Sequence, residues 1–346
     1  MAGDLQRHEP QDFAERQAHN RWVSAWIVLL FLLLFLAVGL SVDYVYLDAF
    51  TPSGPPFAVA TVLSLALATG ITLVSYYQGS ELILRSLGAE ALDLQIPEHR
   101  ELRNVVTEMA LASGCPMPKI YVIFDPAPNA FATGRDQLHA SVCVTTGLLT
   151  LLNREETQGV IAHELAHVRN DDILLMTLVT ILLGGIAILS DWAQRSFSSS
   201  RSRRGTAGKS AMLVIPAVLL ILFAPLISRL LAMAVSRQRE YLADATGVEY
   251  TRNPLGLGKA LVKIRDAAMP FSRASRGTAH LFFVNPLWRR VDEREGRLAD
   301  LLSTHPPIAR RILLLYQMGG LPVGSRVEGI NDQGKMQKAK LKMQNE

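Results

Sequence analysis

Two long apolar stretches constrain the fold of this chain more than any other feature. Residues 22–42 and 57–77 carry no charge and are 21 residues long each. A helix needs about 20 apolar residues to cross the hydrocarbon core of a bilayer. The apolar core of the first stretch is too long for a signal peptide, and four acidic residues precede it. Both stretches are therefore predicted to be transmembrane helices, and the first is predicted to be a retained anchor.

Two shorter apolar stretches, residues 173–190 and 211–227, lie at the low end of spanning length. We expect them to form a helix pair, with three alternatives for its placement. The pair crosses the bilayer, dips partway into it, or is buried inside the protein. The Ser- and Arg-rich residues between them, 196–210, are predicted to be a solvated loop.

The distribution of basic residues predicts the topology. Three arginines precede residue 22, whereas residues 43–56 contain no Lys or Arg. The positive-inside rule therefore places residues 1–21 in the cytoplasm and residues 43–56 outside. The basic residues at 195–209 oppose this rule if the second helix pair crosses the bilayer. Whether or not it crosses, the segments before residue 173 and after residue 227 lie on the same side.

Composition excludes several other classes of protein. The net charge is only +4, and the basic residues are not interleaved with aromatic ones, so no nucleic-acid partner is expected. Cys115 and Cys143 are the only cysteines, which argues against a disulfide framework and against a thiolate metal site.

The middle of the chain predicts a small sheet beside helices. Helical spacing covers residues 98–113, strands are predicted at 120–124 and 140–145, and a helix begins at 147. The edge of such a sheet can pair with an extended substrate, or it can be a structural hairpin that caps the core. Substrate contacts are expected at four consecutive residues: Asn129, Ala130, Phe131 and Ala132.

His163, Glu164 and His167 form an H-E-x-x-H motif in a helix-forming run over residues 156–172. Residues i and i+4 share a helix face, so both imidazoles can reach one metal ion while Glu164 acts as general base. A chance occurrence of this pattern on a helix is the alternative. The helix can also run on into the apolar stretch at 173–190.

A catalytic zinc needs a third protein ligand, and Glu240 is the best candidate. It follows the fourth apolar stretch and lies four residues before Asp244, on the same helical face. Asp244 can then accept the N–H of a ligating histidine. Alternatively, Glu240 and Asp244 lie on a surface face of the helix and form ion pairs with Arg237 and Arg239. Nitrogen and oxygen donors of this kind suit zinc best.

These motifs together resemble the HtpX-like family of membrane-embedded zinc metalloproteases, relatives of the CAAX prenyl endoproteases. The resemblance covers residues 78–318 and the two leading helices. It rests on residues 129–134, on the H-E-x-x-H motif with Asn170 and Asp172, on residues 236–244, and on residues 303–307 ahead of Arg311. The family pattern often has Gly between Asn170 and Asp172, where this chain has Asp171.

The resemblance implies a mainly α integral membrane protein with a cytoplasmic gluzincin-type α+β metalloprotease domain that contains a small β-sheet. It implies one Zn²⁺ per chain on His163, His167 and Glu240, with Glu164 as general base. It suggests His305 as an oxyanion donor, although His305 can instead cap a helix. Arg311 and Asp172 are expected to be structural partners in the site.

The predicted organisation is a cytoplasmic segment (1–21), two transmembrane helices (22–77), a metalloprotease domain (78–318) and a disordered basic tail (319–346), for which a long helix is the alternative. The expected protein is a multi-pass endopeptidase of a bacterial inner membrane with its active site facing the cytoplasm. The bilayer and membrane or membrane-proximal proteins are its expected partners, in protein quality control. A processing protease for lipidated peptides and a catalytically silent scaffold or chaperone are the alternatives. Oligomeric state and cleavage specificity are not predicted.

Overall fold

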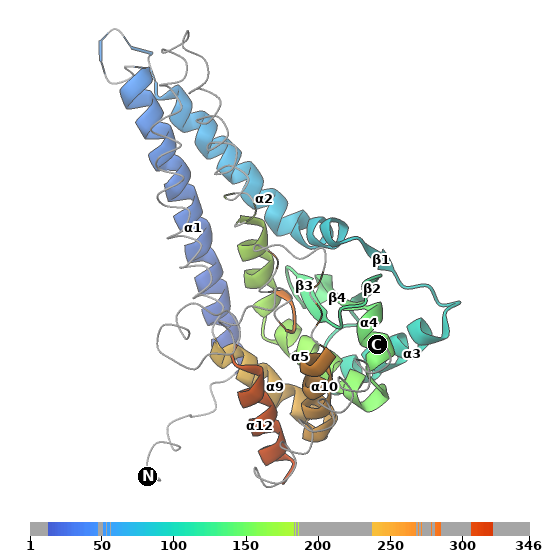
Figure 1. Cartoon of the computed structure of the whole chain (residues 1–346). Coiled ribbons are helices and arrows are strands. Elements are labelled where there is room, and N and C mark those ends of the chain that lie inside the picture. The colour runs from blue at the N-terminus through green and yellow to red at the C-terminus, as the bar shows by residue number, and fades with distance from the viewer. Residues whose placement is uncertain are drawn as a thin grey trace, which may run out of the picture.

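The described part of the chain is mainly helical, with one small sheet (Figure 1). The structure is a computed structural model that describes residues 13–47, 51–52, 54–55, 57–182, 184, 186, 237–267, 269, 271, 278, 281–284 and 306–320. The predicted helix at 211–227, the loop at 196–210 and nearly all of the tail lie outside these residues.

Two long helices, α1 (Phe13–Tyr46) and α2 (Val59–Leu87), form an arm that projects from the rest of the molecule (Figure 1). Their apolar segments, Gln17–Tyr44 and Val59–Leu87, are long and apolar enough to cross a membrane. Only 33% and 17% of the residues in their apolar windows are buried, so most of this surface is exposed. That exposure suits lipid contact better than the core of a soluble domain.

The sheet has four strands in the order β1-β2-β4-β3. Strand β2 (Lys119–Ile123) is parallel to β4 (Ala140–Thr145), while β1 (Ala89–Ala91) and β3 (Ala130–Gly134) add antiparallel edges. The strands predicted at 120–124 and 140–145 correspond to β2 and β4. The two edge strands were not predicted. All five residues of β3 are buried, so its sequence lacks the alternation that marks a strand with one wet face.

Helix α5 (Arg154–Arg169) lies at the centre of the domain and contacts α3, α9, α10 and the sheet. Asn153 and Glu156 form a capping box that starts it, with each side chain accepting from the other residue's backbone N–H. Further helices in the described residues are α3 (Pro97–Ser113), α4 (Thr146–Leu151), α9 (Arg237–Thr251), α10 (Pro254–Ala267) and α12 (Ile308–Met318), with a short 3₁₀ turn, η1 (Gln137–His139).

The chain turns sharply at the C-terminal end of α5. The helix ends at Arg169, Asp171 has a φ of 56°, and a new helix runs over Asp172–Leu182. The motif helix therefore does not continue unbroken into the third apolar stretch. This new helix packs Leu175, Val179 and Leu182 into one cluster with Ile27 and Phe31 of α1.

Candidate metal centre

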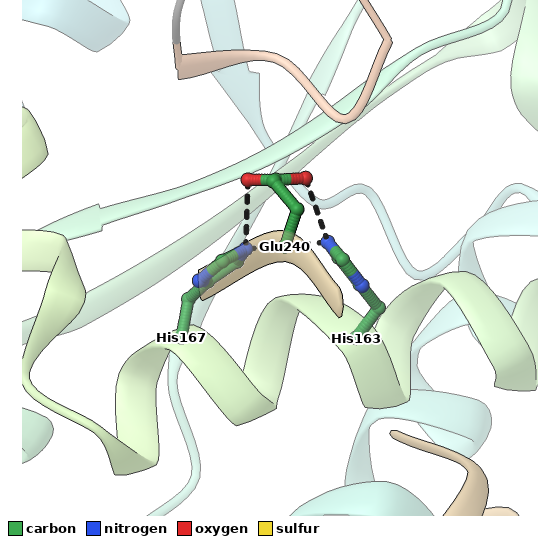
Figure 2. Close-up of side chains that lie close together, drawn as sticks. All are labelled: His163, His167 and Glu240. Atoms are coloured by element: carbon green, nitrogen blue, oxygen red, sulfur yellow. Dashed lines mark hydrogen bonds and ion pairs between the residues drawn. The ribbon is translucent and has the colours of Figure 1, made fainter. Parts of the chain in front are cut away.

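Two buried histidines on one face of α5 form the base of the site. His163 and His167 are 1% and 4% exposed, and their Nε2 atoms lie 3.2 Å apart. The i, i+4 spacing places both rings one above the other on the same side of the helix. Figure 2 shows both rings rising from α5 toward the same point.

Glu240, in the first turn of α9, completes the group from a distant part of the sequence. Its Oε2 lies 3.7 Å from His163 Nε2, and its Oε1 lies 3.6 Å from His167 Nε2. The carboxylate therefore straddles the two rings (Figure 2). Within the described residues, these three side chains form a group whose potential ligand atoms all lie within 4.8 Å of one another.

Each histidine has its own carboxylate on the opposite ring nitrogen. His163 Nδ1 lies 2.9 Å from Asp244 Oδ1, and His167 Nδ1 lies 2.9 Å from Asp172 Oδ2. A proton on each Nδ1 then donates to a carboxylate and leaves the Nε2 lone pair directed toward Glu240. Metal-ligating histidines in proteins almost always donate their other ring N–H to an acceptor of this kind, a backbone carbonyl or water.

Arg311 of α12 forms hydrogen bonds with the carboxylate of Asp244. Its guanidinium donates to both oxygens of that carboxylate, at 2.8 Å and 2.7 Å, and to the Phe283 carbonyl at 3.2 Å. It also lies 3.5 Å from Glu240 Oε2. Asp244, Asp172 and Arg311, all expected near the site, thus surround the three central side chains. A bidentate contact holds a carboxylate in a defined plane.

Glu164 is buried beside this group at 2% exposure and accepts a hydrogen bond from the Ala132 backbone N–H. Burial is the largest influence on its carboxyl group. Together with the charge of Glu240 it outweighs the opposing effects of His167 and Arg311 and raises the pKa of Glu164 to about 7. A carboxylate with such a pKa can exchange a proton near neutral pH.

The two histidines differ in the charge that their surroundings favour. Burial lowers the pKa of His163 to about 4, with Arg311 and His167 adding to the effect. Burial also lowers the pKa of His167, but the hydrogen bond to Asp172 and the charges of Glu240, Asp172 and Glu164 outweigh it and raise that pKa to about 9. The surroundings of His167 Nε2 therefore stabilise a positive charge, which a metal cation would supply in place of a proton.

The geometry of the three side chains fits a zinc ion. Tetrahedral ligands at about 2.0–2.1 Å from zinc lie about 3.3–3.4 Å from one another. The separations here are 3.2, 3.6 and 3.7 Å. Two imidazoles and a carboxylate are also a ligand set that zinc enzymes use, with the fourth position left for water.

The strand edge that was expected to contact substrate is partly covered by the chain itself. Asn129 Nδ2 donates to the Val284 carbonyl at 2.7 Å, and the Phe283 N–H donates to the Ala130 carbonyl at 2.8 Å. Phe131 packs in a T-shaped contact against Phe282, with 5.1 Å between ring centroids. Ala132 remains the residue of this edge that touches Glu164. Substrate contact at residues 129–132 stays a prediction.

Phe283 is a site residue that sequence reasoning missed. Its ring meets His163 in a T-shaped contact, with centroids 4.9 Å apart, and lies under the Arg311 guanidinium at 4.7 Å. Nothing in its local pattern marks it, because the contact depends on a segment more than a hundred residues from the motif. His305, the expected oxyanion donor, lies outside the described residues, so its role stays a prediction.

A helical H-E-x-x-H pair joined by a distant glutamate, in a chain with two apolar helices of spanning length, defines the class of membrane metallopeptidases. The sequence profile of Peptidase family M48 matches residues 97–318, and the chain belongs to that family. The predicted membership of the HtpX-like family is confirmed by the relatives described next.

A protease HtpX homolog of Caldanaerobacter subterraneus subsp. tengcongensis is 42% identical over 309 residues, which cover 88% of this chain and 97% of the relative. One from Thermoanaerobacter pseudethanolicus is 46% identical over 249 residues, covering 71% and 80%. The crystal structure of S. mikatae Ste24p matches with a TM-score of 0.44 at 20% identity, covering 85% of this chain and 66% of that one. This last likeness is too loose to support a structural argument.

Proposed function

We propose that this protein is a membrane-embedded, zinc-dependent endopeptidase whose single zinc ion is held by His163, His167 and Glu240. The observation that carries the proposal is the convergence of two imidazole nitrogens and one carboxylate, 3.2–3.7 Å apart, from two helices far apart in sequence. Membership of Peptidase family M48 supports the peptidase activity.

The chemistry that a bound zinc ion supplies is polarisation of the scissile carbonyl and acidification of the attacking water. Glu164 accepts the proton of that water and returns it to the leaving amine. Asp244 and Asp172 hold the two rings by their Nδ1 atoms, and Arg311 holds Asp244. Burial of the whole group excludes bulk water and strengthens its electrostatic interactions.

The proposed orientation places the metal centre at the cytoplasmic face of a bacterial inner membrane, with residues 78–318 as the metalloprotease domain. The basic residues before the first span and their absence from residues 43–56 support this topology. Substrates are then membrane proteins or cytoplasmic segments close to the bilayer, in protein quality control. The names of the relatives, protease HtpX homologs, support a protease of this kind.

The test is cleavage of casein or a membrane protein substrate by the purified full-length protein, comparing wild type with Glu164→Gln. The variant removes the proton acceptor and keeps all three proposed ligands. We expect it to retain zinc and to lose about 10²- to 10⁴-fold in turnover, the usual contribution of a positioned general base.

Zinc content measured on the same samples separates metal loss from loss of the base. A chelator should abolish wild-type cleavage, and added zinc should restore it. If Glu164→Gln cleaves as fast as wild type, the proposed mechanism is wrong. If zinc-loaded wild type cleaves neither substrate, the proposed function is wrong, and a catalytically silent scaffold becomes the better explanation.

A further inference from the structure

The first apolar helix reaches the metal centre. Asn20 lies near the N-terminal end of the α1 span and is 5% exposed. Its Nδ2 donates to Asp172 Oδ1 at 2.6 Å and to the Asn170 carbonyl at 2.9 Å. This amide therefore bridges α1 to the turn that follows the motif helix. Figure 1 shows the same end of α1 close to α9.

Asp172 divides its two oxygens between α1 and the metal site. Oδ2 lies 2.9 Å from His167 Nδ1, whereas Oδ1 accepts from Asn20 and lies 3.6 Å from an Arg239 nitrogen of α9. The residue is fully buried. A carboxylate held through one oxygen cannot rotate without breaking that contact, so the direction of its other oxygen is set as well.

We propose that Asn20 is a positioning residue of the metal centre, which acts by holding Asp172 and through it the ring of His167. The inference rests on the proposed function, because it assigns His167 as a metal ligand. It gives the first membrane helix a role in the active centre beyond anchoring. A neutral amide suits this role, since it donates a hydrogen bond to Asp172 without competing with His167 for a charge partner.

Gln17 provides a matched control on the same helix. One turn before Asn20, its Nε2 donates to the Arg169 carbonyl at 2.8 Å, and the structure shows no hydrogen bond from this side chain to Asp172. Gln17→Leu therefore removes a hydrogen bond between α1 and the C-terminal end of α5, next to that turn, while the path to His167 stays intact. A purely structural role for this contact region predicts similar effects of Gln17→Leu and Asn20→Leu.

The experiment measures zinc retention against a competing chelator, and kcat and KM, on full-length protein in detergent. We expect Asn20→Leu to weaken zinc retention roughly three- to tenfold, less than the 10- to 100-fold typical of losing a carboxylate such as Asp172 itself. Its kcat should fall while KM stays within about twofold, and Gln17→Leu should resemble wild type. Asn20→Ala is made in parallel, because its smaller side chain avoids the bulk of leucine.

A second arm places Asn20→Ala in an Asp172→Ala background. If Asn20 acts through Asp172, the substitution has no further effect on zinc retention there. The inference is overturned if the Asn20 and Gln17 variants weaken zinc retention equally. It is also overturned if Asn20→Ala weakens zinc retention as much in the Asp172→Ala background as in wild type. A wild-type protein that neither holds zinc nor cleaves substrate instead overturns the proposed function, so the two failures are distinguishable.

Discussion

At the scale of single residues, the site is organised by paired contacts. Each histidine has a carboxylate on Nδ1, and each carboxylate is in turn held by another side chain. Arg311 holds Asp244, and Asn20 holds Asp172. In metal sites, such outer contacts fix ring orientation and raise the basicity of a ligating nitrogen, so changes to their residues weaken metal binding.

Asp171 belongs to the same scale, because its backbone has a φ of 56° in the turn after α5. Left-handed backbone is unstrained for Gly and tolerable for Asp, but it costs a β-branched residue more. We expect Asp171→Gly to be at least as stable as wild type and Asp171→Val to lose about 1–2 kcal/mol. Thermal unfolding of purified protein measures both. A valine variant as stable as the glycine variant would contradict this account.

At the scale of elements, α5 depends on a close approach of its neighbours. A Cβ at Gly159 would lie 2.7 Å from the Leu257 backbone nitrogen and 2.8 Å from its Cα, at the start of α10. Gly247 of α9 likewise faces the backbone of His163 at 3.1 Å. Glycine thus allows α9 and α10 to pack against the motif helix, which brings Glu240 to the histidines.

Gly159→Ala should therefore push α10 away from α5. Backbone atoms cannot move aside as a flexible side chain can, so we expect a loss of about 1–3 kcal/mol in the free energy of unfolding. Gly70→Ala in α2 is the control, because its Cβ would meet nothing within 4 Å. Equal melting temperatures for the two variants would show that the α5–α10 contact is looser than these distances indicate.

At the scale of the whole molecule, the apolar arm formed by α1 and α2 adjoins a domain that has its own hydrophobic core around α5. The arm exposes large side chains along its length, whereas the domain buries its own around α5. The proposed topology places the α1–α2 connection and the domain on opposite sides of the bilayer.

Labelling of single cysteines tests this topology. Cys115 and Cys143 are both buried, so they contribute little background. Thr51→Cys lies in the α1–α2 connection, and Leu111→Cys lies on α3 at a position that is 79% exposed. In intact cells with a permeable outer membrane, a membrane-impermeant maleimide should label the first variant only. Labelling of Leu111→Cys should require disruption of the inner membrane, and the reverse pattern would refute the orientation.

Local patterns in the sequence were sufficient to predict the two long helices and the strands β2 and β4. They were also sufficient to select His163, His167 and Glu240 as candidate metal ligands. Apolar run length, alternation and i, i+4 spacing are properties of neighbouring residues, so they can be read from the chain alone. Strands β1 and β3 lacked such signals, because one is three residues long and the other is buried on both faces.

Only the tertiary structure decided the contacts between distant segments. It placed the Glu240 carboxylate oxygens 3.6–3.7 Å from the Nε2 atoms of two histidines more than seventy positions earlier in the sequence. It also brought the Phe283 ring into a T-shaped contact with His163. It also joined Asn20 to Asp172 across 152 positions. These contacts depend on how whole helices pack, which is a sum over many side chains that no local spacing in the sequence records.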